Sequence, residues 1–226
     1  VFFLMIPRPP ISTPLYSSAA SDVYKRQTLS LAALLLFSFT YAQKAVLKSG
    51  SFKALKGQKE VNLVYDYDAL KIGTGKKAKA EDTYVNEKVE EYNKKEAGKG
   101  DSWKVAFKGD RDRVYHLKFE ELFNKSLSKA GIKASQNNSG AKYTLHVKTT
   151  RIEPGWNIGI SKYPAFVDLL FTLTETGSTT PLGVAEQLNN PGAQAMGFDY
   201  DSSTRISEAY AKGAKVFAGF LGKQTK

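Results

Sequence analysis

Histidine and cysteine, the residue types that most often serve as bases, nucleophiles and metal ligands, are scarce in this chain of 226 residues. It contains two histidines, His116 and His146, and no cysteine. A zinc–thiolate site, a disulfide framework and a cysteine nucleophile are therefore excluded, and little material remains for a histidine-rich metal site. Neither H-E-x-x-H nor G-x-S-x-G occurs. We expect both imidazoles to be packed or surface side chains, with no catalytic residue, no metal site and no cofactor.

Pairs of acidic residues are the remaining candidates for acid–base chemistry, and they occur at Asp66/Asp68, Glu120/Glu121 and Asp199/Asp201. Glycoside hydrolysis requires two carboxyl groups roughly 5 to 9 Å apart across a cleft, and these spacings do not indicate one. The glycine-rich segments 72–80 and 192–197 do not match a phosphate-binding loop. We therefore expect solvated acids, and an unrecognised hydrolase stays open only as an alternative.

Four aromatic residues are the candidates for binding a ligand. Trp156 and Tyr163 flank a glycine-interrupted hairpin, and Phe198 and Tyr200 lie in a glycine-rich loop before the last helix. Exposed aromatic rings stack on sugar rings or on the surface of a partner. The alternative is that these rings pin their loops to the hydrophobic core.

Apolar patterns predict four strands that would position these residues. Segments 61–67 and 143–149 alternate between apolar and polar residues, 166–173 is apolar on both faces, and 182–188 is the last candidate. Segment 166–173 predicts a central strand, because it is apolar on both faces. Asp168 within it requires a partner, because an unpaired buried carboxylate is costly.

Two helices are predicted between the first and second strands. Segment 82–97 is rich in Glu and Lys, with a narrow apolar stripe, and indicates a partly exposed helix with a solvated charged face. A loop, 98–103, follows. The next helix has Asp110 as its expected cap and Gly131 as its expected stop.

The last helix follows the glycine-rich loop, with Ser203 or Thr204 as the expected cap. Gly213 lies on its apolar stripe and predicts a close approach to a sheet. The order of elements predicts an α+β fold, with a single, mostly antiparallel sheet of about 4–5 strands and two or three helices packed on one face.

The first 42 residues differ in character from the rest of the chain. Residues 1–27 contain four of the eight prolines and resemble translated sequencing-adapter DNA, which predicts a non-native or disordered leader. Residues 28–42 combine an apolar run, shorter than the roughly 20 residues that span a bilayer, with small residues typical of a signal-peptide cleavage site. Residues 43–226 then form a single α/β envelope domain. We expect a periplasmic or secreted protein, without a transmembrane span in its mature part.

The net charge of residues 43–226 limits which classes of partner are expected. Residues 43–226 carry 30 basic and 21 acidic side chains, a net charge of +9. A basic protein of this kind often binds nucleic acid, but export and the interleaving of lysines with acids argue against it here. We expect an envelope protein or an anionic envelope polymer as the partner.

Residues 43–226 resemble small signal-peptide-bearing proteins of Gram-negative Bacteroidetes-type bacteria. The resemblance rests on four segments: LKGQKEVNLVYDYD, KFEELFNKSL, YTLHVKTTRIEPGWNIGI and AMGFDYDSSTRISEAYAKGAK. More distantly, the pattern after Phe119 is similar to periplasmic domains of envelope lipoproteins, such as activators of penicillin-binding proteins and the N-terminal domain of the Tol system's propeller protein. Gln43 stands where those lipoproteins have cysteine. The resemblance implies an exported protein and carries no functional residue over to this chain.

Three functions remain in competition at this stage. The first is a non-enzymatic periplasmic or secreted interaction domain in cell-envelope maintenance, and the second is a binding module for an anionic glycan or envelope polymer. The third is the unrecognised hydrolase. The candidate ligand-binding residues Trp156, Tyr163, Phe198 and Tyr200 serve the first two.

Overall fold

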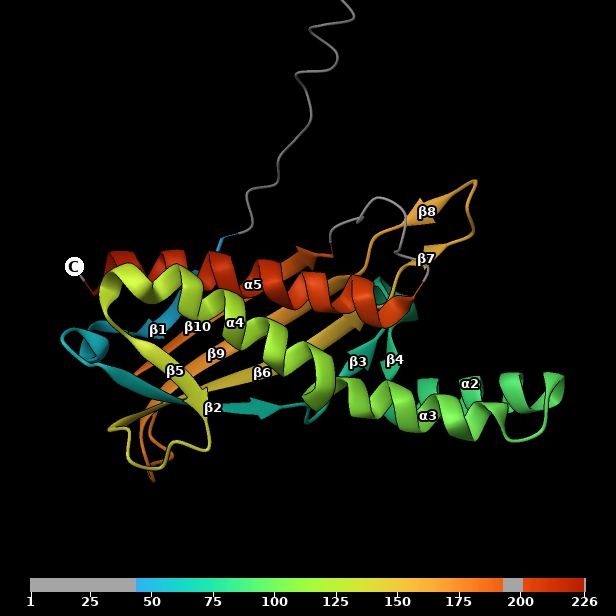
Figure 1. The fold of residues 1–226 in the computed structure, drawn as a ribbon, viewed down its shortest axis with the longest axis horizontal. Helices are drawn as coiled ribbons and strands as arrows, with labels where there is room; N and C mark the ends of the chain where they lie inside the picture. Colours follow the sequence, from blue (N-terminus) through green and yellow to red (C-terminus); the bar gives the residue numbers. More distant parts are fainter. Residues whose placement is uncertain (1–43, 193–200, 226) are drawn as a thin grey trace, which may run out of the picture. The chain divides into compact units, whose positions relative to one another are not determined.

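An eight-stranded mixed sheet is the framework of the protein (Figure 1). The computed structural model describes residues 44–192 and 201–225. The six strands of the main path run in the order β1 (Val46–Gly50), β10 (Gly183–Pro191), β9 (Phe166–Glu175), β6 (Tyr143–Glu153), β2 (Glu60–Asp66) and β5 (Lys133–Gln136). Of two short strands, β3 (Lys71–Ile72) pairs with β6, and β4 (Lys79–Ala80) pairs with β3. A separate two-stranded sheet consists of β7 (Trp156–Asn157) and β8 (Lys162–Tyr163). The predicted leader, 1–27, and signal peptide, 28–42, lie outside the described residues.

The sequence-based prediction of a single, mostly antiparallel sheet of about 4–5 strands is wrong. The main sheet has eight strands, and β2 pairs in parallel with both β5 and β6. The missed strands are short: β1 is exposed along its whole length, and β5 buries only Ala134. Such segments lack the alternation that identifies a strand, and their pairing is imposed by neighbouring strands. The coarser expectation of an α+β composition is confirmed.

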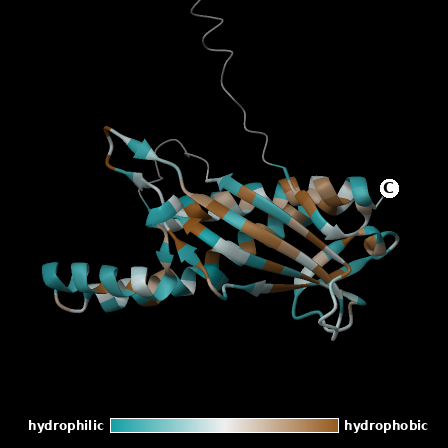
Figure 2. Cartoon of the chain, turned by 180° about the vertical axis from the view of Figure 1, so that it is seen from behind, coloured by the Kyte–Doolittle hydropathy of each residue, from teal (hydrophilic) through white to brown (hydrophobic). Residues whose placement is uncertain are grey.

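Two helices, α4 (His116–Leu127) and α5 (Ser202–Gln224), pack on one face of the sheet, as Figure 1 shows. The opposite face, seen from behind in Figure 2, carries no helix of the described residues and mixes hydrophilic and hydrophobic residues. Two further helices, α2 (Glu81–Lys95) and α3 (Lys99–Asp110), pack against each other as a hairpin, which we call the arm. A π-helical turn, η3 (Arg111–Tyr115), joins the arm to α4.

The helix boundaries differ from the expected ones in two places. The expected loop 98–103 is largely the first turn of α3, and Asp110 lies inside a continuous helical stretch instead of capping one. The cap of α5 is Asp201, whose carboxylate accepts hydrogen bonds from the backbone N–H groups of Ser203 and Thr204. Asp, Ser and Thr all accept such bonds, so composition alone does not choose among them.

The core lies between the sheet and the helices α4 and α5, and stacked phenylalanine rings fill it. Phe217 of α5 stacks on Phe171 of β9 with ring centroids 3.6 Å apart, and on Phe123 of α4 at 6.0 Å. Gly213 makes this approach possible, because a Cβ atom there would lie 2.7 Å from a methyl group of Leu169. The predicted role of Gly213 is therefore confirmed.

The described residues also contain three 3-10 turns: η1 (Lys53–Leu55), η2 (Gly75–Lys77) and η4 (Ser128–Ala130). The last of these ends at Gly131, whose φ of 70° is the left-handed conformation expected of a helix stop. Within the two described ranges, no helix has both the length and the apolar character needed to cross a bilayer.

Candidate functional site

A groove with aromatic walls lies where the arm meets the N-terminal end of α5 and the β7–β8 hairpin. Its volume is about 390 Å³. Five aromatic side chains line it: Tyr84, Tyr92, Trp103, Phe107 and Trp156. Concave sites with aromatic walls and a few polar groups are typical of ligand-binding pockets. We call this site the aromatic groove.

The arm supplies most of the aromatic wall. Tyr84, Lys88 and Tyr92 are spaced at i, i+4 and i+8 on α2, which places them on one side of the helix. Trp103 of α3 stacks on Phe107 with centroids 5.0 Å apart and meets Tyr92 edge-on at 5.5 Å. These rings therefore support one another as a preformed surface.

Gly100 brings the two helices of the arm close enough for this packing. A Cβ atom at Gly100 would lie 2.2 Å from the carbonyl oxygen of Val89, closer than any side chain tolerates. The backbone N–H of Gly100 also donates to the Asn93 side chain over 2.7 Å. The position of Trp103 in the groove thus depends on a glycine three residues before it.

The other side of the groove is built on Arg205, which is 4 % exposed at the start of α5. Its guanidinium donates to the carbonyl oxygens of Pro154 at 3.1 Å and Gly155 at 3.2 Å. Gly155 has a φ of 64°, and a Cβ atom there would lie 2.4 Å from the carbonyl oxygen of Tyr163. These contacts fix the base of the hairpin that carries Trp156 into the groove.

The structure brings one of the four predicted ligand-binding residues into the aromatic groove. Trp156 lines it and is 44 % exposed. Tyr163 is the cross-strand partner of Trp156, but its ring packs against Phe166 and does not line the groove. Phe198 and Tyr200 lie outside the described residues. The predicted hairpin itself is confirmed.

Sequence analysis missed the part of the groove that comes from the arm. The segment 82–97 was expected to present a solvated charged face, and Trp103 was expected in a loop. The available signal was the spacing of Tyr84, Lys88 and Tyr92 together with a tryptophan in a charged segment. That spacing also fits an ordinary buried stripe, so it does not by itself indicate a site.

Charge at the groove is mixed. Lys88 of α2 lies 2.8 Å from the Glu91 carboxylate, and its ammonium group is 5.5 Å from the centre of the Tyr92 ring. Burial raises the pKa of the Tyr84 phenol to about 12, with smaller contributions from nearby groups including Glu153. Tyr84 therefore stays neutral at physiological pH and can donate a hydrogen bond.

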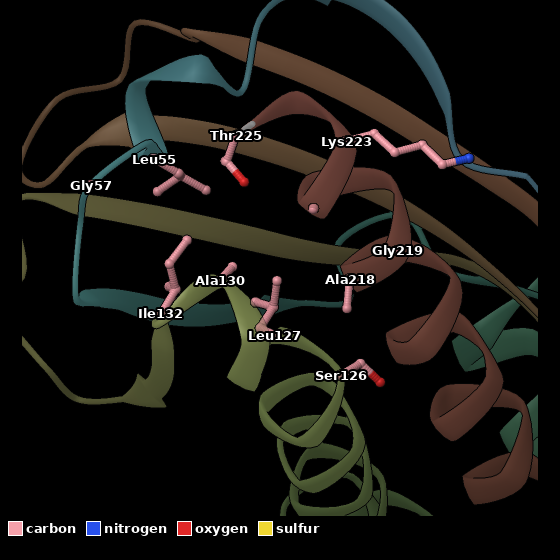
Figure 3. Close-up of a pocket in the computed structure, with 11 residues that line it drawn as sticks. Leu55, Gly57, Ser126, Leu127, Ala130, Ile132, Ala218, Gly219, Lys223 and Thr225 are labelled. Atoms are coloured by element: carbon pink, nitrogen blue, oxygen red, sulfur yellow. The ribbon is translucent and has the colours of Figure 1, made fainter.

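A second groove, of about 480 Å³, lies near the C-terminal ends of α4 and α5 (Figure 3). Its apolar lining includes Leu55, Leu127, Ile132 and Ala218, and Lys223 stands at its edge. Since α5 rises by about 1.5 Å per residue over 23 residues, the two grooves are roughly 30 Å apart along this helix.

The two histidines lie on opposite sides of the sheet. His116 is buried on the helix side, where its ring stacks on Tyr65 at 3.8 Å and its Nε2 is 2.9 Å from the Tyr67 hydroxyl. Burial lowers its pKa to about 4, although the Asp112 carboxylate 3.0 Å from Nδ1 acts in the opposite direction. His146 lies on the other side, and burial lowers its pKa as well. Neither imidazole lines either of these grooves.

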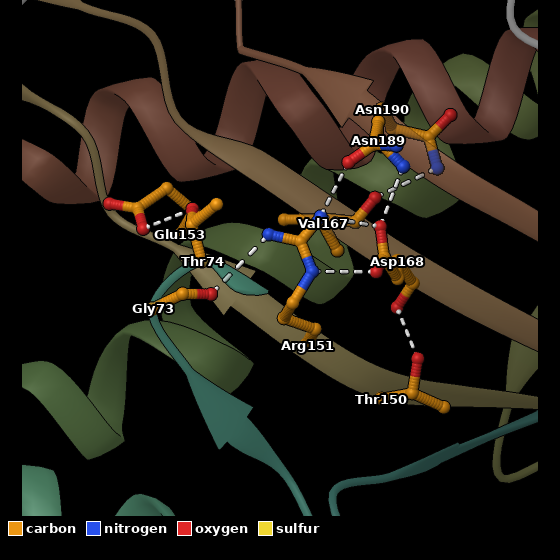
Figure 4. Close-up of polar contacts among 9 residues, drawn as sticks. All are labelled: Gly73, Thr74, Thr150, Arg151, Glu153, Val167, Asp168, Asn189 and Asn190. Atoms are coloured by element: carbon orange, nitrogen blue, oxygen red, sulfur yellow. Dashed lines mark hydrogen bonds and ion pairs between the residues drawn. The ribbon is translucent and has the colours of Figure 1, made fainter. Parts of the chain in front are cut away.

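Asp168 has the partner that its place in a central strand requires (Figure 4). Arg151 donates to both of its carboxylate oxygens, from Nε at 2.7 Å and from Nη2 at 2.9 Å. The same guanidinium donates to Asn189 at 2.7 Å, and the backbone N–H of Asn189 donates to Asp168 at 2.6 Å. The guanidinium also donates to the carbonyl oxygen of Gly73 at 3.4 Å, so its contacts are made within the protein, and the arrangement is that of a structural ion pair.

The described part of the chain contains no group of three or more His, Cys, Asp or Glu side chains placed to hold a metal ion. Of the acids named above, Asp66 and Asp68 both lie near Lys148, at 3.2 and 3.7 Å, and Asp201 caps α5. The aromatic groove is therefore the arrangement best suited to binding a ligand.

Comparison with known proteins gives limited information. No protein-family model matches the chain, and no curated protein matches it. Among solved structures, the PelC dodecamer from Paraburkholderia phytofirmans is similar, with 12 % identity, a TM-score of 0.33, and coverage of 75 % of this chain and 96 % of that chain. A single-substitution variant of the same dodecamer gives 10 % identity, a TM-score of 0.32, and coverage of 75 % and 95 %. These values are too low to assign a function to this chain.

Proposed function

We propose that this chain is a non-enzymatic binding domain of the cell envelope, and that the aromatic groove binds an anionic glycan. The export part of the proposal rests on the signal-peptide pattern of residues 28–42. The proposed class of ligand rests mainly on the five aromatic side chains that line the groove.

The chemistry of the groove supports a sugar ligand. The CH-rich face of a sugar ring packs on an aromatic ring, while its hydroxyl groups need donors and acceptors at the edge. Trp103 and Trp156 supply ring surface from two different elements, and the neutral Tyr84 hydroxyl supplies a donor. Lys88 at the edge favours a sugar that carries a carboxylate or phosphate.

Intrinsic fluorescence tests the proposal directly, because both tryptophans of the chain line this groove. The protein is titrated with hexamers of galacturonate and, in parallel, with neutral cellohexaose. We expect a saturable change in tryptophan emission with the acidic hexamer, and weaker binding of the neutral one. Raising the salt concentration should weaken only the acidic ligand, since the charge contribution is screened.

Variants examined by calorimetry link the binding to the groove. Trp156→Ala and Tyr92→Ala should each weaken binding roughly tenfold, or about 1.4 kcal/mol. Tyr163→Ala is the matched control, because it removes an exposed ring from the same hairpin outside the groove. Equal losses in Trp156→Ala and Tyr163→Ala, or no binding of either hexamer, would exclude the proposed function.

A further inference from the structure

The end of the protein near the C-terminus of α5 is unusual in its charge. Three segments distant in sequence meet there, 51–59, 122–136 and 216–225, and together they contain seven lysines and no Asp or Glu. The backbone N–H of Lys133 donates to the carbonyl oxygen of Lys59, and α4 packs on α5. We call these three segments the lysine end.

Much of the positive charge of the lysine end has no acidic partner among the described residues. Among the described residues, five of its lysines form no ion pair: Lys53, Lys59, Lys125, Lys133 and Lys223. Two of them, Lys125 and Lys223, lie in the last turns of α4 and α5, where a cation complements the helix dipole. The others have no such role, so the excess charge is available to an anion.

The lysine end also contains the second groove, and its apolar wall is recessed. Leu55, Leu127, Ile132 and Ala218 line the groove and are each at most 4 % exposed (Figure 3). Gly219 and Gly222 of α5 leave one wall without side chains, and a Cβ atom at either would meet no atom within 4 Å. A volume of about 480 Å³ falls within the range of small-molecule sites.

The recessed shape of this groove favours a single alkyl chain over a membrane surface as its ligand. A protein that docks on a bilayer inserts protruding apolar side chains. None of the large exposed hydrophobic side chains of the described residues lies in the three segments of the lysine end. The apolar surface there is concave, and it suits a chain that enters it.

We propose that the groove of the lysine end binds the alkyl chain of a single anionic amphiphile, whose charged head lies among the surrounding lysines. The tail removes apolar surface from water in the groove, and the head meets three segments that contain lysines and no acids. This site is separate from the aromatic groove and does not depend on the proposed glycan function.

Calorimetry with dodecanoate, kept below its micelle concentration, tests the proposal on the whole chain. Two probes separate tail from head: dodecyltrimethylammonium has the same tail with a positive head, and hexanoate has the same head with a short tail. We expect saturable binding of one dodecanoate per protein, with at least tenfold weaker binding of either comparison probe. Absence of saturable dodecanoate binding would overturn the proposal.

A variant that fills the groove with a side chain tests the binding site most directly. Gly222→Leu places a side chain in open space and replaces glycine by a better helix former, so the variant should fold. We expect it to weaken dodecanoate binding at least tenfold. Gly109→Leu is the matched control, since Gly109 is also helical, also open and lies in the arm. Equal affinity of the two variants would refute the groove as the site.

Charge is tested by a second pair of variants. Replacing Lys53, Lys125 and Lys223 by Gln should weaken dodecanoate binding several-fold, whereas the same change at Lys94, Lys104 and Lys212 should leave it unchanged.

Sedimentation with vesicles containing phosphatidylglycerol tests whether the lysine end binds a membrane surface instead. Vesicle binding that Gly222→Leu does not reduce, without binding of monomeric dodecanoate, would assign the lysine end to a membrane surface and overturn the proposal.

Discussion

The arm and the lysine end lie near opposite ends of α5 and use charge in different ways. The arm, residues 81–110, has eight acids and six lysines, and many of them pair, as Glu91 does with Lys88 at 2.8 Å and with Lys95 at 2.9 Å. The lysine end has seven lysines and no acid. The net charge of residues 43–226 therefore conceals a slightly negative region with an aromatic groove and a positive region with an apolar groove. Charge composition alone does not show where an anion would bind.

The two regions also use glycine differently, and this gives the largest expected effect. Gly100→Leu forces a side chain against the Val89 backbone in the arm, and should lower the free energy of unfolding by about 3 kcal/mol. Gly222→Leu in the lysine end meets open space and should leave stability equal or higher. Urea unfolding measures both, and a change in tryptophan emission reports whether the aromatic groove, lined by Trp103 and Trp156, opens. Equal stability of the two variants would show that the arm does not depend on close helix packing.

The junction between the arm and the sheet should make stability depend on pH. His116 titrates near pH 6.5 when unfolded, but burial lowers its pKa to about 4 in the folded protein. As the pH falls from 6.5 towards 4, the unfolded state takes up the proton first, so stability is lost in this window and is constant above it. The loss is about 3 kcal/mol at most.

Urea unfolding of the wild type and of His116→Gln at pH 7.5, 5.5 and 4.5 measures this contribution. The variant removes the titration and keeps a polar partner for the Tyr67 hydroxyl, 2.9 Å from the imidazole. The difference between the two proteins should shrink as the pH falls. A constant difference from pH 7.5 to 4.5 would contradict the assignment of the pH dependence to His116.

Paired and unpaired charged side chains should also differ in their contribution to the free energy of unfolding. This effect should be smaller than those of Gly100→Leu and of His116 protonation. Glu81 of the arm pairs with Arg111, whose guanidinium lies 4.0 Å from the centre of the Tyr67 ring. Glu81→Gln should lower the free energy of unfolding by about 2 kcal/mol, because a charged hydrogen bond at a largely buried site is lost. Lys125→Gln in the lysine end should change it by less than about 0.5 kcal/mol. Equal effects in thermal unfolding would remove the distinction between the regions.

The sequence predicted those helices and strands that are long enough to show a repeating pattern of apolar residues. The central strand, the last helix and the hairpin of Trp156 and Tyr163 were predicted, and the structure confirms them. The short strands were not predicted, because segments of two to five residues, such as 46–50, are too short to show a repeating apolar pattern. Parallel pairing was not predicted because it depends on segments that are distant in the chain. The number and direction of the strands were wrong for these reasons.

The candidate site was predictable only in part. An exposed tryptophan beside a glycine in a hairpin drew attention to Trp156, but its partners Tyr92 and Trp103 come from helices 50 to 70 residues earlier in the chain. Similarly, Asp168 was predicted to need a partner, yet Arg151 was not identified. The bulge between Thr149 and Arg151 sets the register that places the guanidinium opposite the carboxylate.

By itself, the sequence determined the absence of cysteine chemistry, the positive net charge and the position of the longest elements, because these follow from composition and local periodicity. Only the tertiary structure decided which side chains meet. It gathered five aromatic residues into one groove and brought three lysine-rich segments together at another, while placing the two imidazoles on opposite sides of a sheet. Contacts between distant segments depend on strand register and helix packing, which no local pattern of residues encodes.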